Sequence, residues 1–451
     1  MVSAVARPVL PAPGPPGLPL LGHLLAFGRD PLSFFARLRD DYGDFAGWSL
    51  GPRRSLFISR PEHIAEFLGA VERTFEVIDI SWAFRQLVGE SVILSRGADW
   101  QRKRSLVQPA VRPRQVREYA ATMVECGVAH ADRWRDGQRI DVLAEMTTLT
   151  QRIVVRTLFG GDLGDQGGAL GAAMAVAQRE IRAELRGISL FLPGWVRTPA
   201  RRRLLAAVAT IDAEVNRLIS DRPADGTRPG QGDDLLTRLL AVRDGEGRPL
   251  SPKEVRDEAV TLWAAGHETT STALTWAWYL LSRSREARDR LTGELARVLG
   301  GRPPTVDDYE RLDWTRQVVK EAMRLYPPVW ALPAMAREGA TLGGVPVPAG
   351  TTVWCSPWTT HRDPRWFPDP AAFRPERWDP DAQQVPDHAW FPFGGGQRAC
   401  LGARFALVEA TLLLATLAQR FDLQVDPGEP VPRPGLILQP AEPLRATLHA
   451  L

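Results

Sequence analysis

The most constraining feature of the sequence is a stretch from Ser251 to about Leu281 that is expected to form one long helix. It opens with Ser251-Pro252-Lys253-Glu254, which has the form of a capping box with proline at the first helical position. At 1.5 Å per residue, a helix of this length spans roughly 45 Å. The stretch is apolar nearly all round at 259–265 and again at 273–281. Such a helix must be buried, which fits a large, mainly helical domain.

A polar segment, Gly266-His267-Glu268-Thr269-Thr270-Ser271, interrupts the middle of this apolar helix. Burying each neutral group unpaired costs roughly 2–7 kcal/mol, so these groups are tolerable if they face a wet cavity. Gly266 and the threonines can loosen the helix, because the Thr269 hydroxyl can bond the Ala265 carbonyl four residues back. The alternative is a kinked helix whose polar patch is satisfied internally and has no function.

A second informative segment, 393–402, reads FGGGQRACLG. Its glycines allow unusual backbone angles and close approach to a flat or bulky group, and Arg398 adds a fixed positive charge. Cys400 directly precedes an expected helix, whose N-terminus favours a thiolate, and a thiolate is a strong ligand for soft metals. No second cysteine lies nearby, so a cofactor must supply the other metal ligands, and haem does so. The alternative is an inert buried cysteine in a glycine-rich turn.

This segment matches FxxGxRxCxG and resembles the haem-binding loop of the cytochrome P450 monooxygenases. The resemblance implies haem b as cofactor, with Cys400 as the axial thiolate and therefore the iron ligand. It also implies that Phe393 packs under the haem and tunes the sulfur, and that Arg398 pairs with a haem propionate.

The polar segment of the long helix resembles the AGxET motif of the same family. The resemblance implies that O2 binds beside Gly266 and that Glu268 and Thr269 deliver protons, which makes these two residues the expected catalytic pair. The reaction implied is oxidation of a substrate C–H bond with O2.

Two further motifs occur in the order the family has them. Glu321 and Arg324 lie at i, i+3 on one face of a half-buried helix and can pair. They resemble the ExxR motif, whose third member is then Arg377, and the implied role is to hold the loop that carries Cys400. Trp100 and Arg104 resemble the WxxxR helix, with both side chains on a propionate. Many members place another propionate-binding arginine near the position of Ala334, so Arg337 is not assigned to the haem.

The rest of the chain is consistent with one large P450 domain, mainly α with a small β region. We expect a proline-rich N-terminal arm at 1–29 and the haem domain at 30–451. A helix is expected at 31–42 and another at 401–421, with short β runs such as 55–59 and 351–355. The stretch 221–234 is interpreted as a surface loop, with an interdomain linker as the alternative. The apolar run 18–27 contains proline and is too short to span a bilayer, so no membrane anchor is expected.

Composition limits the partners. The 56 Lys and Arg residues nearly balance 53 Asp and Glu, which does not favour nucleic-acid binding. Three widely spaced cysteines give no disulfide framework and favour a reducing cytoplasm. The chain has no dinucleotide or P-loop fingerprint and about fifty residues after Cys400. A monomer is expected that takes electrons from a separate ferredoxin and ferredoxin reductase. The candidate basic docking face consists of Arg102, Lys103, Arg112, Arg114, Arg117 and Arg404, with an ordinary solvated face as the alternative.

The substrate is expected to be an uncharged hydrophobic small molecule such as a terpenoid, because the segments that line the pocket in the family are apolar and aromatic here. The residues concerned are Ile80, Trp82, Phe84, Trp263, Trp330, Leu332 and Ile437. A fatty-acid or polyketide hydroxylase is the alternative, and a fatty acid would need a cation such as Arg53 or Arg54. A haem-thiolate isomerase and a non-catalytic haem sensor are two further readings, which the intact Glu268-Thr269 pair disfavours.

Overall fold

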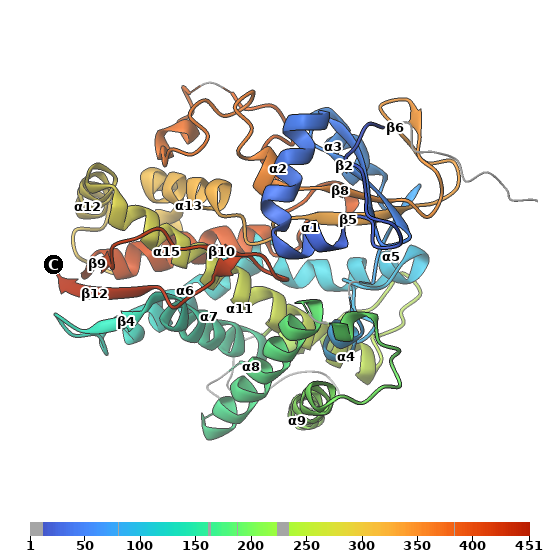
Figure 1. Ribbon diagram of the computed structural model, residues 1–451. Helices are drawn as coiled ribbons and strands as arrows, with labels where there is room; N and C mark the ends of the chain where they lie inside the picture. The colour runs from blue at the N-terminus through green and yellow to red at the C-terminus, as the bar shows by residue number, and fades with distance from the viewer. Residues whose placement is uncertain (1–11, 80, 161–163, 187, 223–233, 383) are drawn as a thin grey trace, which may run out of the picture. The chain divides into compact units, whose positions relative to one another are not determined.

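The computed structural model describes residues 12–79, 81–160, 164–186, 188–222, 234–382 and 384–451 (Figure 1). Helices dominate and the sheets are small, which confirms the predicted fold class of a mainly α single domain. Within it the chain forms two compact units. Unit 1 comprises Met1–Ile78, Val329–Ala372 and Gln383–Cys400, and unit 2 comprises Asp79–Pro328, Phe373–Ala382 and Leu401–Leu451. The expected boundary between an arm at 1–29 and a domain at 30–451 stays a prediction, and residues 1–11 lie outside the described residues.

Unit 1 is built around a mixed sheet with the strand order β1-β2-β8-β5-β3. Strands β2 and β8 are parallel, with Ser55 opposite Thr352, and the other neighbours are antiparallel. The elements of unit 1 are α1 (Leu24–Arg29), α2 (Pro31–Tyr42), β1 (Phe45–Leu50), β2 (Arg53–Ile58), α3 (Pro61–Ala70), β3 (Phe75–Val77), β5 (Leu332–Ala336), β6 (Thr341–Leu342), β7 (Val345–Pro346), β8 (Thr352–Cys355), α14 (Pro357–Thr360) and the 3₁₀ turn η5 (Gly396–Arg398).

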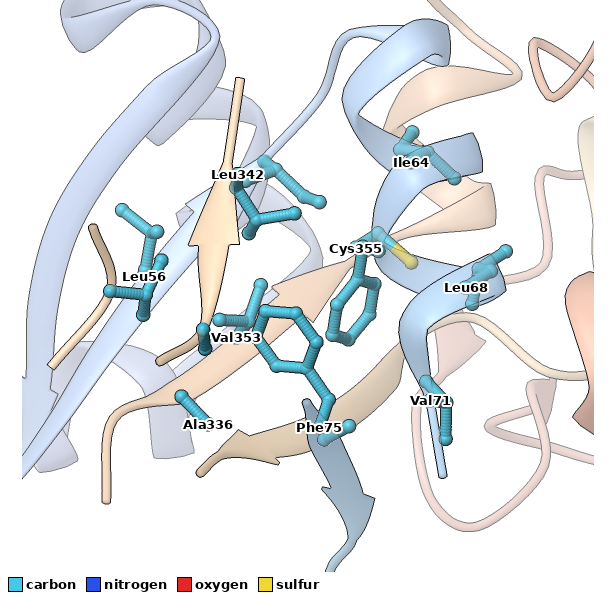
Figure 2. Packing of buried hydrophobic residues seen from close by; sticks show 14 of the residues in the cluster. Leu56, Ile64, Leu68, Val71, Phe75, Ala336, Leu342, Val353 and Cys355 are labelled. Carbon is cyan, nitrogen blue, oxygen red and sulfur yellow. The ribbon is translucent and has the colours of Figure 1, made fainter. Parts of the chain in front are cut away.

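The core of unit 1 forms where α3 packs on this sheet (Figure 2). Ile64 and Leu68 of α3 belong to the same buried cluster as Leu56 and Val353 of the central strands. Cys355 lies in the same cluster and is fully buried. The packing fixes α3, whose last turn supports the loop that carries Cys400.

Unit 2 is mainly helical. Its helices are α4 (Trp82–Val88), α5 (Gly97–Val107), α6 (Pro113–Ala131), α7 (Val142–Phe159), α8 (Gly164–Arg186), α9 (Pro199–Ser220), α10 (Leu235–Ala241), α11 (Pro252–Arg283), α12 (Arg285–Leu299), α13 (Asp313–Leu325) and α15 (Ala403–Ala418). The 3₁₀ turns are η1 (Gln108–Val111), η2 (Ile188–Phe191), η3 (Val306–Arg311) and η4 (Pro375–Trp378), and the strands are β4 (Arg139–Asp141), β9 (Phe421–Val425), β10 (Pro432–Arg433), β11 (Gln439–Pro440) and β12 (Arg445–Ala450).

Helix α11 is the central helix of unit 2, and α7 packs along it (Figure 1). Its start confirms the prediction, because Ser251 and Glu254 form a reciprocal capping box and Pro252 is the first helical residue. The helix ends at Arg283, two residues beyond the expected end at Leu281. Its polar middle does not interrupt the helical assignment. The buried residues on either side of that middle anchor α11 in the core.

Most predicted elements are present near their predicted bounds. Helix α2 matches the expected 31–42, and β2 and β8 match the two expected β runs within a few residues. Helix α15 is shorter than the expected 401–421, since the chain enters β9 at Phe421. Of the expected loop at 221–234, residues 223–233 lie outside the described residues. Among the described helices, none is both long and apolar enough to cross a membrane.

Candidate functional site

The loop from Phe393 to Cys400 in unit 1 is held mainly by its own backbone. The Cys400 N–H donates to the Phe393 carbonyl at 2.9 Å, and the Gly394 N–H donates to the Phe391 carbonyl at 3.0 Å. The thiol at the end of the loop is exposed. Helix α15 begins at Ala403, three residues later in the chain. The loop therefore presents Cys400 at its end with an accessible sulfur.

Two glycines of this loop adopt backbone angles that other residues rarely take. Gly394 has a φ of 69° and Gly396 a φ of 61°. A Cβ added to Gly396 would lie 2.2 Å from the backbone carbonyl oxygen of Leu68, at the end of α3. Glycine is thus required at 396 both for the turn and for the close contact.

Arg398 is paired with a carboxylate that the sequence reasoning missed. Its Nε and Nη2 donate to Glu72 Oε1 at 3.0 and 2.6 Å, within unit 1. Glu72 adopts a φ of 78°, which is unusual for a non-glycine residue. No sequence motif marks Glu72. The pairing of Arg398 with a propionate stays a prediction, and Glu72 fixes the direction of its guanidinium.

Arg337, which the sequence analysis does not assign to the haem, pairs with Glu76 at 3.2 Å.

The middle of α11 in unit 2 has an accessible face. Between Val255 and Leu281, all of which are described, every residue is buried except 262, 264, 265, 266 and 269. Leu262, Ala265, Gly266 and Thr269 follow the i, i+3, i+4, i+7 spacing of one helix side. We call these four residues the open face of α11. The Thr269 hydroxyl donates to the Ala265 carbonyl at 2.8 Å, as predicted.

Glu268 points away from the open face, toward α8 and the C-terminal strands. Its Oε1 accepts hydrogen bonds from Arg182 Nη1 at 2.9 Å and from the Gln439 amide at 3.2 Å. Burial raises the pKa of this carboxyl above its ordinary value, and the Arg182 charge opposes that rise. A buried carboxyl with a raised pKa is suited to holding a proton.

His267, between Gly266 and Glu268, is a buried neutral imidazole. Its Nδ1 lies 2.7 Å from the Trp263 carbonyl and its Nε2 lies 3.2 Å from Gln178 Nε2. Burial lowers the pKa of His267 to about 4. The carbonyl can only accept, so Nδ1 carries the proton and Nε2 accepts from Gln178. Gln178 and Arg182 are one turn apart on α8, so two polar contacts join α8 to α11.

A second buried carboxyl near the polar segment was not predicted. Glu409 of α15 is fully buried beside Thr270, and burial raises the pKa of its carboxyl to about 8. An apolar helix such as α15 gives no sequence signal that one glutamate faces α11. Unlike Glu268, Glu409 has no arginine among the groups that shift its pKa.

Glu321 and Arg324 form a completely buried pair in α13. Arg324 Nε and Nη2 donate to the two Glu321 oxygens at 2.9 and 2.8 Å. The same carboxylate accepts from the Arg374 N–H and the Trp378 indole, both at 3.0 Å, and Arg377 Nε lies 3.4 Å from it. The predicted triad is therefore assembled, with Trp378 as a partner that the sequence reasoning did not assign.

The remaining predicted cofactor and pocket residues are distributed over both units. Trp100 is buried in α5, and Arg104 follows one turn later. Trp82 is covered by two guanidiniums, with Arg201 4.5 Å from its ring centre. In unit 1, Leu332 Cδ1 lies 3.8 Å from a Cβ built on Gly394, which places it against the Cys400 loop.

Trp330 joins an aromatic cluster with Phe27 and Phe35 in unit 1. Phe84 and Ile437 are mostly buried. Trp263 is completely buried and lies off the open face of α11, and its place as a lining residue stays a prediction. Ile80 lies outside the described residues.

The predicted basic docking face needs correction. Lys103 is buried and pairs with Asp99, because its chain turns inward to the Glu90 carbonyl. Arg102 is paired with Asp244 and Glu254. Further ion pairs join Arg117 to Asp307, Arg404 to Glu310 and, more loosely, Arg114 to Glu118. These acids neutralise much of the positive charge that composition alone suggested.

Known proteins match this sequence along nearly the whole chain. The family model described as Cytochrome P450 matches residues 12–447. "Cyclooctatin synthase" of Streptomyces melanosporofaciens is 38% identical over 96% of this chain and 94% of its own length. "Cyclooctat-9-en-7-ol 5-monooxygenase" of the same organism is 35% identical, covering 94% and 91%. "Pentalenene oxygenase" of Streptomyces avermitilis is 34% identical, covering 97% and 96%.

A solved structure, "Retinoic acid bound cyanobacterial CYP120A1", matches with a TM-score of 0.86 and 27% identity over 98% of this chain and 99% of that chain. Members of the matched family bind haem through an axial cysteine thiolate and use O2 with electrons from a redox partner. Both units, with all the motifs described above, lie almost entirely within the matched residues. The chain therefore belongs to the cytochrome P450 family and is a monooxygenase.

Proposed function

We propose that this monooxygenase hydroxylates or further oxidises a hydrophobic terpenoid, using haem held by Cys400. The observation that carries the substrate class is the agreement of two independent features. The named relatives act on terpenoids such as pentalenene and cyclooctat-9-en-7-ol. The candidate lining residues of this chain are apolar or aromatic, which suits a ligand held by area burial rather than by charge.

The assignment of Cys400 as axial ligand is supported by its exposure to solvent, which the other two cysteines lack. Cys126 and Cys355 are buried, and burial raises the pKa of the Cys355 thiol far above its ordinary value. Cys400 is exposed, and a glycine-rich loop leaves space beside it. A thiolate ligand needs an accessible sulfur, so Cys400 fits haem and the other two cysteines do not.

The other site residues are proposed in supporting roles. Trp100, Arg104 and Arg398 would hold the propionates, and Phe393 would pack beneath the ring. Glu321, Arg324 and Arg377 would hold the loop that carries Cys400. When bound, haem supplies the activation of O2 for transfer of one oxygen atom to the substrate.

Two neighbouring residues of α11 would manage the protons. Thr269, together with Gly266, lies on the open face, where its hydroxyl is accessible. Glu268 stores a proton at a carboxyl oxygen, and the Arg182 ion pair orients that carboxyl. A proton leaving the Glu268 carboxyl would reach the open face only after the Glu268 side chain turns away from Arg182, because neighbouring residues of a helix do not face each other.

A fatty-acid or polyketide hydroxylase is the second candidate, because the solved structure that this chain resembles is bound to retinoic acid, a carboxylic acid. A carboxylate would need a cation, and Arg53 and Arg54 follow the turn between β1 and β2. Replacing both by alanine separates the candidates. A terpenoid should keep its dissociation constant within about threefold, or under ~0.7 kcal/mol. A loss of tenfold or more, with a strong rise in that constant with salt, would favour the carboxylic acid.

The direct test is a screen of terpenes and fatty acids against the holoenzyme, reading the change in haem spin state and then the oxidised product. Pentalenene and matched-size fatty acids are suitable first probes. Spin-state change and product with terpenes alone support the proposal. Turnover of fatty acids in preference to terpenes would reject it.

The electron donors are proposed to be a ferredoxin and its reductase, in the cytoplasm. Three widely spaced cysteines fit a reducing compartment. Arg112 and Arg114, which are exposed, remain candidates for contact with an acidic ferredoxin. Reconstitution with ferredoxin, reductase and NADPH tests this, and a failure to accept electrons from any ferredoxin tried would contradict it.

A further inference from the structure

The first turns of α11 hold the end of α4 and the turn that follows it through a row of hydrogen bonds. The groups come from the first turns of α11 and reach backbone atoms between Leu87 and Val92. They are Arg256 Nη1 to the Leu87 carbonyl at 2.8 Å, Asp257 Oδ2 from the Glu90 N–H at 3.0 Å, Glu258 Oε1 from the Val92 N–H at 2.8 Å, and Thr261 Oγ1 to the Val88 carbonyl at 3.5 Å. We call Arg256, Asp257 and Glu258 the clamp.

The clamp residues are buried, which is costly for charged side chains. Arg256, Asp257 and Glu258 are 7%, 3% and 0% exposed. Removing a partner from such groups strands the others in a medium that solvates them poorly. Arg256 is balanced by Asp212 and Asp257, whereas Glu258 has the Val92 N–H, and burial raises the pKa of its carboxyl to about 8. The carboxylates of Asp257 and Glu258 thus hold the backbone N–H groups of Glu90 and Val92.

Gly89 fits the clamp in a way that no other residue can. It has a φ of 59°, and a Cβ built on it would lie 2.2 Å from the Asp257 carboxyl carbon. The Asp257 carboxylate therefore occupies the space that a side chain at position 89 would need. A methyl group at 89 must push the carboxylate off the Glu90 N–H or push the turn away from α11.

Helix α4 depends on such contacts for its position. It has seven residues, too few to be stable alone. A cavity of about 490 Å³ lies between α4 and α11, lined by Arg85 and Gln86 of α4, by Gly89 and by Lys253, Arg256 and Asp257 of α11. Ala83, Phe84, Leu87 and Val88 of α4 are buried, and the hydrogen bonds of the clamp fix its C-terminal end in addition. At the other end the Ser81 hydroxyl caps α4 by accepting from the Phe84 N–H at 3.0 Å.

We propose that the clamp positions α4 so that Trp82 and Phe84 form a fixed wall of the substrate pocket, which makes Arg256, Asp257, Glu258 and Gly89 determinants of substrate selectivity. This rests on the proposed function in one respect, the placement of α4 along the pocket. The clamp residues are positioning residues. They act through the backbone of α4.

The test uses two haem ligands of different size, so the natural substrate need not be known. Imidazole is small, and phenylimidazole adds a ring that must fit the pocket wall. Each is titrated into the holoenzyme and followed by the shift of the main haem absorption band. In Gly89→Ala the dissociation constant for phenylimidazole should rise by about tenfold, and that for imidazole by less than about twofold. Hydrogen exchange of the amides at 87–92 should quicken by about tenfold.

Companion variants separate the clamp from general destabilisation. Asp257→Ala should reproduce the effect, and Asp257→Asn should largely rescue it, because an amide oxygen can still accept from the Glu90 N–H. Gly89→Ala should raise the dissociation constant for phenylimidazole less in the Asp257→Ala background than in the wild type. The carboxylate that would meet the new methyl group is absent there. Lys253→Ala is the control, because Lys253 pairs with Asp257 at 2.8 Å but is 71% exposed.

Two results would overturn the proposal, and they are distinguishable. Unchanged exchange at 87–92 in Gly89→Ala would show that there is no clamp, and this arm needs no haem chemistry. Faster exchange with an unchanged ratio of the two dissociation constants would show that α4 is not a pocket wall. Failure of the proposed haem site itself would appear differently, as a wild-type protein whose absorption neither ligand shifts.

Discussion

The loop that carries Cys400 and the polar middle of α11 both contain predicted site residues, and they are held in opposite ways. In the loop, main-chain bonds and glycines at positive φ fix the geometry, and a Cβ at 396 would meet a backbone carbonyl. In α11 the backbone is an ordinary helix, and side-chain pairs such as Glu268 with Arg182 satisfy the polar groups. A segment held by its backbone should tolerate few substitutions. A segment held by side chains should still fold with many substitutions, and these should lower activity rather than stability.

A third arrangement, in which a buried carboxylate holds a loop backbone, should show the largest effect. Glu321→Ala leaves Arg324 buried without its carboxylate and frees the Arg374 N–H. The free energy of unfolding should fall by roughly 3–5 kcal/mol, measured by chemical denaturation. Haem content should fall with it. A loss below about 1 kcal/mol would show that α13 does not depend on the pair.

Gly396→Ala tests whether the Cys400 loop is limited by its backbone. The strained φ and the contact with Leu68 should together lower the free energy of unfolding by about 1–3 kcal/mol. Gly344→Ala is the matched control, since Gly344 has a φ of 75° with nothing within 4 Å of an added Cβ. The control measures the cost of the positive φ alone. Equal losses of unfolding free energy in the two variants would show that the contact with Leu68 adds nothing.

The pH dependence of stability sharpens the side-chain half of the comparison. The pKa of Glu409 is near 8 in the folded protein against 4.5 ordinarily, so its neutral form favours folding. That contribution is complete below about pH 4.5 and is lost as pH rises toward 8, at about 1.4 kcal/mol per pH unit. Glu409→Gln should flatten this decline between pH 6 and pH 7. An unchanged slope, measured by denaturation at each pH, would contradict the burial of an ionisable group there.

Thr269→Ala should change stability least. The free energy of unfolding should stay within about 0.5 kcal/mol, because Thr269 lies on the open face and its hydroxyl bonds only within the helix. Haem and substrate should bind normally while more NADPH yields peroxide instead of product. Thr272→Ala, which removes a buried hydroxyl from the same helix, is the control. Unchanged coupling of NADPH to product in Thr269→Ala would remove this residue from the proton relay.

The sequence predicted elements whose signals are local. The capping box at Ser251 and the limits of α2 depend on residues a few positions apart, and both are present. The pairing of Glu321 with Arg324 was predictable for the same reason, because i, i+3 residues share a helix face.

Contacts between distant segments could not be predicted. Glu72 meets Arg398, and Glu409 meets Thr270, across long stretches of chain that carry no mark of their proximity. The same limit explains the error over Lys103, whose charge suggested the surface although its side chain is buried beside Asp99.

The central claim, that Cys400 holds the haem as its thiolate, is tested most directly by the absorption spectrum of the reduced carbonyl complex. The wild type, Cys126→Ala and Cys355→Ala should absorb well to the red of a histidine-ligated haem. Cys400→Ser should lose that band and its activity, even where some haem remains bound. A Cys400→Ser protein that keeps both the band and the activity would contradict the account.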